Sequence, residues 1–474
     1  MLLSKHLSLI VGIKNRKMKF KYILSFIVLT GLLSCSDSFT DLAPTSQRNV
    51  GVFYKTGSDM EVAVNAIYNT LKADGCYDQS YWVMQELRSD NTFWDGTGLA
   101  EEITVFDKFT DISTSNITEE AWASSYLGIS RANIVLSRID DIDMDAGLRE
   151  RLRGEALFLR SLFYYHLTVA FGNIPLVLTE TASVEEGQGH TQAVASTVYQ
   201  QLITDLIEAE SKLPQSYSGI DIGRATKGAA ATLLAKIYLV TGANGDAEST
   251  LRRILTYGYE LVDDYADLWG TANEHNVESI FEVEFEGGFG DQGNQFTSQF
   301  NGVLATSVTA GVRNIPERDL VDAYEDGDLR FAASLAEVTD DNTGYTIKYG
   351  LTNDFSEDDA PNNWVVFRYA DVLLMLAEAI GEGGEAYDLI NQVRARAGLG
   401  PIDSNSPGSF TDKLLQERRV ELAFENHRWA DLLRFGAAES VMSAQGKPTN
   451  GKLLFAIPQR EIDLNAGFKQ NPGY

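Results

Sequence analysis

Charged side chains recur at helical spacing near the end of this 474-residue chain. They are Arg418, Glu421, Glu425, Arg428 and Asp431. Side chains three and four residues apart lie on one face of an α-helix, where opposite charges pair. Carboxylates beside basic groups are compatible with an acid/base site and also with a structural ion network beside a packed helix. Because Arg pairs with carboxylates in bidentate geometry, the ion network is the favoured interpretation.

Three helices must position these side chains. Apolar residues from Tyr369 to Ile380 recur at steps of four, three and four, as on one face of a helix. Glycines follow, and a second apolar face runs from Tyr387 to Ala397, so these two helices must pack antiparallel. A third long helix carries the charges, and its apolar stripe consists of Leu415, Leu422, Trp429 and Leu433.

Start and stop signals predict more helices upstream. The sequence Ser58–Glu61 is a capping box that begins one helix, and Gly75 ends it. Further helices are expected at Glu119–Ile139, Asp145–Phe171, Thr197–Leu213, Thr226–Thr241 and Ala247–Tyr257. Helix hairpins in series indicate stacked helical repeats, although their spacing does not define the repeat type. The predicted fold class is therefore mainly α.

Two stretches lack this helical periodicity, at about residues 75–116 and 263–363. The second contains strand-like runs at Ile280–Phe285 and Thr343–Tyr349, and between them the Gly-rich segment Gly287–Phe296. These two stretches are expected to contain a few short strands and long loops.

Several blocks of the sequence carry a family resemblance. They are RYADVLLMLAEA, NQVRARAGL, ERRVELAFENHRWADLLR and the final LLFAIPQREIDLNAGFKQNPGY, in that order. Together they resemble the C-terminal signature of the SusD/RagB family. The upstream segment LRGEALFLRSLFYYHLTVAFGNIPLV extends the resemblance over most of the mature chain.

The resemblance implies a fold and a function. Family members are outer-membrane lipoproteins that bind glycans and cap a TonB-dependent transporter. The implied scaffold has four tetratricopeptide-like units and carries a less regular lobe. The two non-helical stretches, at about residues 75–116 and 263–363, should be the inserts that form this lobe. The implied partners are an oligosaccharide and a SusC-like TonB-dependent transporter, and the implied role is non-catalytic.

The first residues are typical of a secretory signal. Beginning at either Met1 or Met18, a basic stretch leads to the apolar run Tyr22–Leu33, which is too short to span a bilayer. Leu32-Leu33-Ser34-Cys35 fits a lipobox, so residues 1–34 are predicted to be a signal peptide and Cys35 to be lipidated. The alternative is an ordinary signal peptide with an incidental cysteine. Residues 35–57 are predicted to be an extended lead-in, and 58–474 a single domain.

The charge excludes one class of partner. Six of the 39 Lys and Arg residues precede Cys35, whereas none of the 67 Asp and Glu residues does. The mature chain therefore has 33 basic and 67 acidic residues, a formal charge of −34. Such a surface repels nucleic acid and anionic lipid, so an acyl anchor at Cys35 must hold the protein on the membrane. The acidic residues after Cys35 resemble a surface-export tag, so the expected location is the outer membrane, facing the exterior.

Little in the sequence supports catalysis. The histidines after the signal have no metal-ligand spacing, and Asp340–Gly344 resembles a calcium loop but lacks its bidentate Glu. We therefore predict no enzyme activity, no cofactor and no metal. A glycoside hydrolase needs only two carboxylates, and helical repeats commonly bind peptides, so both functions remain alternatives.

Sugar binding requires aromatic faces beside planar polar side chains. Trp94 lies in the polar turn RSDNTFWDGTG, where an exposed ring is expected, and the Gly287–Phe296 loop is expected to face it. Trp122 and Trp429 are assigned to the core instead. The candidate ligand-binding residues are Asn91, Trp94, Asp95, Phe289, Asp291, Gln292, Asn294 and Phe296.

Overall fold

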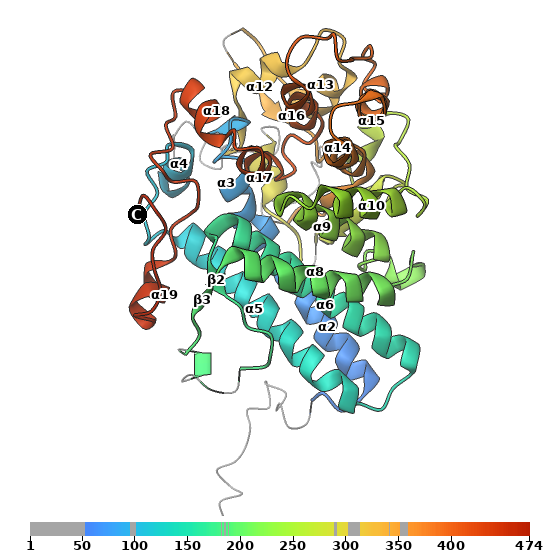
Figure 1. Cartoon of the computed structure of the whole chain (residues 1–474), viewed down its shortest axis with the longest axis vertical. Coiled ribbons are helices and arrows are strands. Elements are labelled where there is room, and N and C mark those ends of the chain that lie inside the picture. The colour runs from blue at the N-terminus through green and yellow to red at the C-terminus, as the bar shows by residue number, and fades with distance from the viewer. Residues whose placement is uncertain are drawn as a thin grey trace, which may run out of the picture. The chain divides into compact units, whose positions relative to one another are not determined.

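The computed structural model describes residues 53–474, apart from 95–100, 182, 184–185, 188, 289–291, 302–312, 341 and 351–358. Contacts divide the chain into residues 1–55 and 56–474, and all the elements below belong to the second unit. That unit is mainly helical (Figure 1). Within the described part of the chain, every helix is too short or too polar to cross a membrane.

Long helices form a scaffold in which each packs against the next along the chain (Figure 1). They are α2 (Gly57–Leu71), α5 (Asn116–Arg138), α6 (Ala146–Phe171), α8 (Ala195–Lys212), α9 (Lys227–Val240), α10 (Asn244–Ile254), α14 (Tyr369–Ile380) and α15 (Gly384–Arg396). This serial stacking of antiparallel neighbours confirms the predicted helix hairpins.

Helix caps decide the boundaries of this scaffold. The Asp145 side chain accepts the Leu148 N–H at 2.9 Å and begins α6, as predicted. The capping box of α2 was predicted two residues too late. Thr56, whose backbone is extended, accepts the Asp59 N–H at 3.2 Å, whereas Ser58 is already helical.

The predicted third long helix is wrong, because the chain breaks in its middle. It forms α16 (Phe410–Glu421) and α17 (Arg428–Arg434), separated by residues that include Phe424 at φ 67° and Asn426 at φ 64°. Positive φ is unfavourable for residues with a side chain and ends helical geometry. The stripe of Leu415, Leu422, Trp429 and Leu433 therefore spans two helices.

Donors from distant segments stabilise this break. Arg368 Nη2 and Tyr265 Oη donate to the carbonyl oxygen of Glu421, at 2.6 and 2.9 Å. Lys348 Nζ donates to the carbonyl oxygen of Ala423 at 2.7 Å. Carbonyls that would otherwise accept the next helical N–H groups are thus satisfied by side chains.

The irregular lobe consists of short elements. Its helices are α3 (Ser80–Gln85), α4 (Glu101–Asp107), α11 (Phe296–Phe300), α12 (Arg318–Ala323) and α13 (Leu329–Ser334), with the π-turn η2 (Asp74–Asp78) and the 3₁₀ turn η5 (Tyr265–Leu268). Its strands are β1 (Thr92–Phe93), β4 (Ser279–Val283), β5 (Ile315–Pro316), β6 (Leu335–Ala336), β7 (Tyr345–Thr346) and β8 (Trp364–Arg368).

These strands form two-stranded antiparallel sheets, in which β1 pairs with β5, β4 with β8, and β6 with β7. The β1–β5 pair joins the two predicted inserts, since Thr92 lies opposite Pro316 and Phe93 opposite Ile315. β7 lies within the predicted run Thr343–Tyr349, and β4 overlaps the predicted run Ile280–Phe285 but begins one residue earlier. The two inserts therefore meet, as expected for one lobe.

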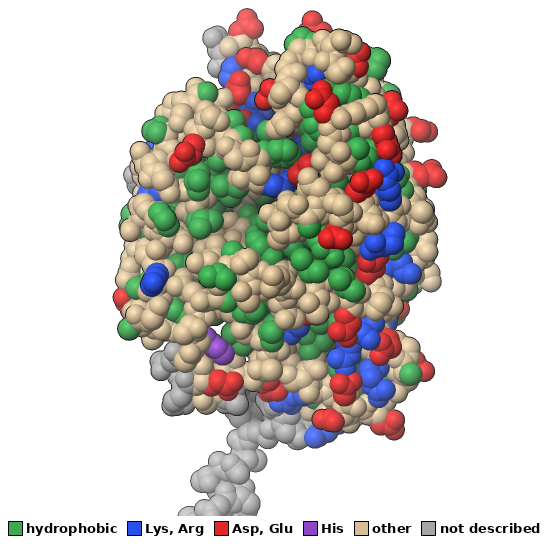
Figure 2. Space-filling model, in the orientation of Figure 1, with side chains coloured by type: hydrophobic (Ala, Val, Ile, Leu, Met, Phe, Trp, Pro, Cys, Tyr) green, Lys and Arg blue, Asp and Glu red, His purple; other side chains and the backbone are tan. Residues whose placement is uncertain are grey.

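The remaining elements complete the scaffold and its C-terminal end. They are the pair β2 (Ile174–Pro175) and β3 (Gln192–Ala193), the helices α18 (Ala438–Ala444) and α19 (Gln459–Leu464), and the 3₁₀ turns η3 (Ile139–Asp141) and η4 (Gly219–Asp221). Figure 2 shows hydrophobic side chains in the middle of one face, with many charged side chains towards one edge and the top.

Candidate functional site

The predicted exposure of Trp94 is wrong. Its side chain is only 5% exposed. The polar turn before it faces inward as well: Asn91 is fully buried, donates to Glu86 at 3.3 Å and accepts from Arg419 at 3.1 Å. Asp90 lies in the same turn and pairs with Arg428. The turn is polar because it joins a buried ion network, and not because it faces solvent.

Phe296 and Asn294 are also structural. Phe296 begins α11 and is fully buried, with its ring 4.8 Å from that of Trp364 and 5.8 Å from that of Phe285. Asn294 is buried too, and its Nδ2 donates to the carbonyl oxygens of Ala360 and Asn362 at 2.9 and 2.8 Å. The expectation that these two side chains contact a ligand is therefore wrong.

The other predicted residues have a different outcome. Gln292 is half-buried, and its Oε1 accepts a hydrogen bond from Nζ of Lys72, the residue that follows α2. Asp95, Phe289 and Asp291 lie outside the described residues. The Gly287–Phe296 loop thus meets the scaffold at Lys72.

The charged stripe is a structural ion network, as the sequence favoured. Arg368 donates to Glu278 and Glu421 at 2.8 and 2.5 Å and to Glu425 at 2.7 Å, and all four side chains are at most 1% exposed. Arg418 pairs in the same way with Asp371 and Asp431. Each acidic member is held by at least one guanidinium, which leaves little freedom for proton transfer.

Electrostatics in the network favour fixed charges. Burial raises the pKa of the Glu421 carboxyl, but Arg396, Arg368 and Arg330 outweigh it and hold that pKa well below its usual range. A general acid or base near neutral pH needs a pKa close to 7. Glu421 is far from that condition, so its geometry and its charge both indicate a structural role.

A solvent-open hollow lies where the Gly287–Phe296 loop meets the scaffold. We call it the Tyr68 hollow. It is lined by Asn65, Tyr68, Asn69, Leu71 and Lys72 of α2 and its C-terminal end, by Ile220, Ile222, Gly223 and Arg224 beside η4, and by Glu282, Val283 and Glu284 of the β4 region. Amide, carboxylate and guanidinium groups dominate its polar lining, and these groups hydrogen-bond sugar hydroxyls.

A second hollow, the Tyr126 groove, lies between α5 and the C-terminal segment. Trp122, Tyr126 and Phe468 give it an aromatic lining, and Pro175 adds an apolar ring. The Tyr126 hydroxyl donates to the Pro175 carbonyl oxygen at 2.7 Å, so its polar group is already satisfied. The sequence analysis missed this groove because Phe468 comes from more than 300 residues away, although Trp122 and Tyr126 share one helix face.

Comparisons with known proteins decide the family. The family model described as "SusD family" matches residues 338–474, and that described as "Starch-binding associating with outer membrane" matches residues 39–239. A solved structure named "Laminarin binding SusD-like protein" is 30% identical, with a TM-score of 0.78, over 89% of this chain and all of that one. This chain belongs to the SusD family. The predicted family and the predicted mainly helical fold are both confirmed.

Two further known proteins match this chain over most of its length. SusD-like protein P2 of Formosa agariphila is 26% identical and covers 96% of this chain and all of its own length. Surface glycan-binding protein A from Bacteroides thetaiotaomicron, solved in complex with laminarihexaose, is 24% identical with a TM-score of 0.76. It covers 88% of this chain and all of its own, and its likeness shows the fold.

Proposed function

We propose that this SusD-family protein binds oligosaccharides at the cell surface and delivers them to a SusC-like TonB-dependent transporter, without cleaving them. The observation that carries the proposal is the 30% identity to a laminarin-binding SusD-like protein over that protein's full length. The acidic surface supports it, because a chain of this charge favours a neutral ligand over nucleic acid.

The proposed sugar surface is the Tyr68 hollow together with the Gly287–Phe296 loop. Lys72 lines the hollow and is bonded to Gln292, so the loop borders the hollow. The neighbouring Asn69 is exposed and supplies a planar amide. Phe289 and Asp291, just before Gln292, and Asp95 remain proposed contacts. In this arrangement the Phe289 ring stacks on a sugar while the polar lining binds its hydroxyls.

A binding experiment tests the function. Calorimetry with laminarin oligosaccharides and with unrelated glucans and mannans should find at least one ligand in the micromolar to millimolar range. The products after long incubation should equal the starting glycan. Shortened products would mean that the alternative of a glycoside hydrolase is right. Binding of peptides with no glycan binding would favour the alternative of a peptide- or protein-binding lipoprotein.

Variants then test the surface. Phe289→Ala should weaken glycan binding by about 1–3 kcal/mol, the scale of one stacking ring and its buried area. Phe468→Ala removes a half-buried ring from the Tyr126 groove and is the matched control, with no expected effect on affinity. The reverse result would place the sugar in the Tyr126 groove and would leave the function itself intact.

The transporter partner is tested separately. Purification of the lipidated protein from native membranes in mild detergent should recover a TonB-dependent barrel of the SusC type. Repeated purification without such a barrel would contradict delivery to a transporter while leaving glycan binding untouched.

A further inference from the structure

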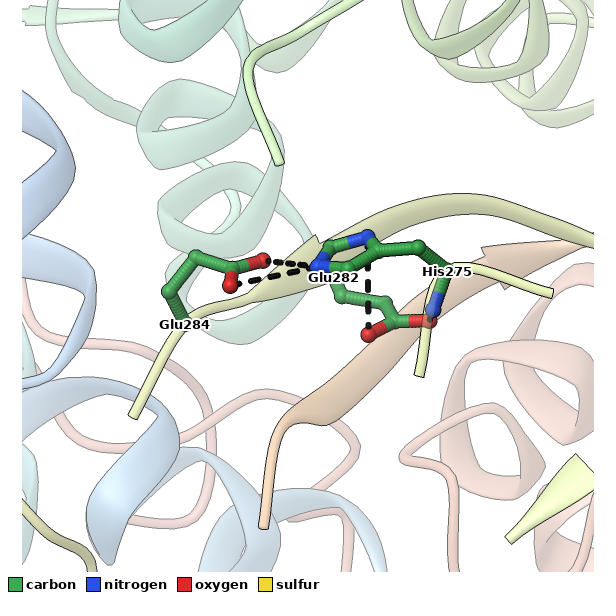
Figure 3. A group of neighbouring side chains, drawn as sticks. All are labelled: His275, Glu282 and Glu284. Atoms are coloured by element: carbon green, nitrogen blue, oxygen red, sulfur yellow. Dashed lines mark hydrogen bonds and ion pairs between the residues drawn. The ribbon is translucent and has the colours of Figure 1, made fainter. Parts of the chain in front are cut away.

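Three side chains that could bind a metal ion converge beside β4 (Figure 3), and two of them, Glu282 and Glu284, also line the Tyr68 hollow. Glu282 belongs to β4 and Glu284 follows directly after the strand ends at Val283, and both carboxylates reach His275. His275 belongs to the segment before β4 and lies between them. Its Nε2 is 3.1 Å from Glu284 Oε1, and its Nδ1 is 3.9 Å from Glu282 Oε2.

Hydrogen bonds hold this arrangement in place. The backbone N–H of His275 donates to Glu282 Oε1 at 3.0 Å. The Asn363 side-chain amide donates to Glu282 Oε2 at 3.0 Å and to Glu284 Oε2 at 3.2 Å. One amide thus orients both carboxylates, as outer-shell residues do around bound metals. The absence of a side chain at Gly223 leaves room for the Glu284 carboxylate, since a Cβ there would lie 2.7 Å from Glu284 Oε1.

The local charge is unbalanced. A third carboxylate, Glu274, accepts the Asn363 backbone N–H at 2.9 Å, so three carboxylates gather around this asparagine beside a single imidazole. Glu282 is almost fully buried, whereas the Glu284 side chain is about half exposed and lines the Tyr68 hollow. Lys72 of the hollow also interacts electrostatically with Glu284, but the three carboxylates still outnumber this lysine and the imidazole. A cation from solvent can therefore reach a cluster with more negative than positive groups.

We propose that His275, Glu282 and Glu284 bind one zinc-class divalent cation, with Asn363 as a positioning residue. One imidazole nitrogen and two carboxylate oxygens are ligands that Zn²⁺ accepts, and the fourth position faces the hollow for water. An imidazole ligand selects Zn²⁺ over Ca²⁺ and Mg²⁺, which prefer oxygen ligands only. The spacing of His275 from the two glutamates matches no known metal-binding motif. The sequence analysis therefore could not find this site and predicted no metal.

The geometry fits with a small movement. The three ligand atoms lie within 4.8 Å of one another. In a tetrahedral site with bonds of about 2 Å, ligand atoms are about 3.3 Å apart, so the cluster must contract by about 1.5 Å. The half-exposed Glu284 side chain can supply that movement. Without a metal, the same residues form an ion pair in which His275 lies between two carboxylates.

Zinc titration distinguishes these two states. The purified protein, without a histidine tag and after chelator treatment, should bind one equivalent of ZnCl₂ in calorimetry and should bind CaCl₂ at least tenfold more weakly. Zinc should raise the melting temperature, and EDTA should reverse the increase. Glu284→Gln should weaken zinc binding at least tenfold, because it removes an anionic ligand but keeps the shape of the side chain.

Glu286→Gln is the matched control. This exposed glutamate lies two residues further along, and its substitution removes the same charge outside the ligand set. It should leave zinc binding within twofold of the unsubstituted protein, and circular dichroism should show that both variants are folded. The proposal is overturned if no zinc binds, or if Glu284→Gln binds zinc as tightly as Glu286→Gln does.

Discussion

The Arg368 guanidinium contacts Glu421 at two points, the side-chain carboxylate and the backbone carbonyl oxygen. Arg368 Nη1 lies 2.5 Å from the Glu421 carboxylate, and Nη2 donates to the Glu421 carbonyl oxygen at 2.6 Å. The first contact neutralises a buried charge, and the second satisfies the carbonyl at the last residue of α16. One arginine from β8 therefore ties the ion network to the point where the helix stops.

Replacement of this arginine should be strongly destabilising. Arg368→Met leaves Glu421, Glu425 and Glu278 without their shared partner in a region that excludes water. Breaking a buried pair by removing one partner costs about 3–5 kcal/mol, and we expect a loss of unfolding free energy in that range. Urea unfolding, followed by circular dichroism, measures it.

The control is an arginine with pairs of the same kind on the surface. Arg252 contacts Glu248 and Glu385, and all three side chains are exposed. Arg252→Met should change the urea midpoint little, because water screens exposed pairs. If the two variants lose the same unfolding free energy, the buried ion network stabilises the fold no more than an exposed ion pair does.

Local patterns predicted the scaffold but not the break between α16 and α17. Helix α14 was predicted from Tyr369 to Ile380 because apolar periodicity and glycine stops lie within the segment itself. The break depends on Arg368 and Tyr265, which lie 53 and 156 residues from Glu421. No local sequence pattern contains those donors. The charged residues keep their helical spacing across the break, so the sequence predicted one continuous helix where the structure has two.

The prediction of the sugar site failed for the same reason, because the deciding contacts are distant in the sequence. The polarity of the turn around Asn91 indicated exposure, because Asn and Asp are typical of surface turns. Its actual partners, Arg419 and Arg428, lie more than 300 residues later and bring that polarity into the interior. The ion network itself was predictable, because the charged residues follow one another at short spacing in the sequence, although they span the break between α16 and α17.

The burial of Trp94 leads to a prediction opposite to that for an exposed ring. Trp94→Ala should lower the unfolding free energy by about 3–5 kcal/mol, as large aromatic truncations in a core do, and so should Trp429→Ala. Ile220→Ala is the control, because Ile220 is 100% exposed and should change stability by less than about 0.5 kcal/mol. A Trp94→Ala protein with unchanged stability but lost glycan binding would restore Trp94 to the ligand site.

Two buried histidines predict acid sensitivity. The pKa of His166 is lowered to about 3 and that of His427 to about 4, mainly by burial, and the nearby charge of Lys236 acts in the same direction on both. Their unfolded pKa is about 6.5, so between about pH 6.5 and pH 4 the unfolded chain binds protons that the folded chain does not. Stability should therefore be fully present above about pH 6.5 and should fall as the pH decreases towards 4.

Urea midpoints from pH 7.5 to pH 4.5 measure this dependence. His427→Gln removes one of the two groups and should reduce the slope between pH 6.5 and pH 4.5, whatever its effect on stability at neutral pH. A midpoint that is constant across this interval would mean that both imidazoles can be protonated in the folded protein.

The membrane anchor is tested with two cysteines that differ in position. We predict that Cys35 is lipidated, because it follows the apolar run and Leu32-Leu33-Ser34. With a formal mature charge of −34, electrostatic attachment to anionic lipid is unfavourable, so loss of the acyl chains should leave no other hold on the bilayer. Cys35→Ser should move the protein into the soluble fraction, and metabolic labelling with a palmitate analogue should disappear. Cys76→Ser is the control, because Cys76 is a buried free thiol, and this variant should stay with the membranes and keep its label. If Cys35→Ser remains in the membrane fraction after a high-salt wash, another segment or a partner retains the protein there.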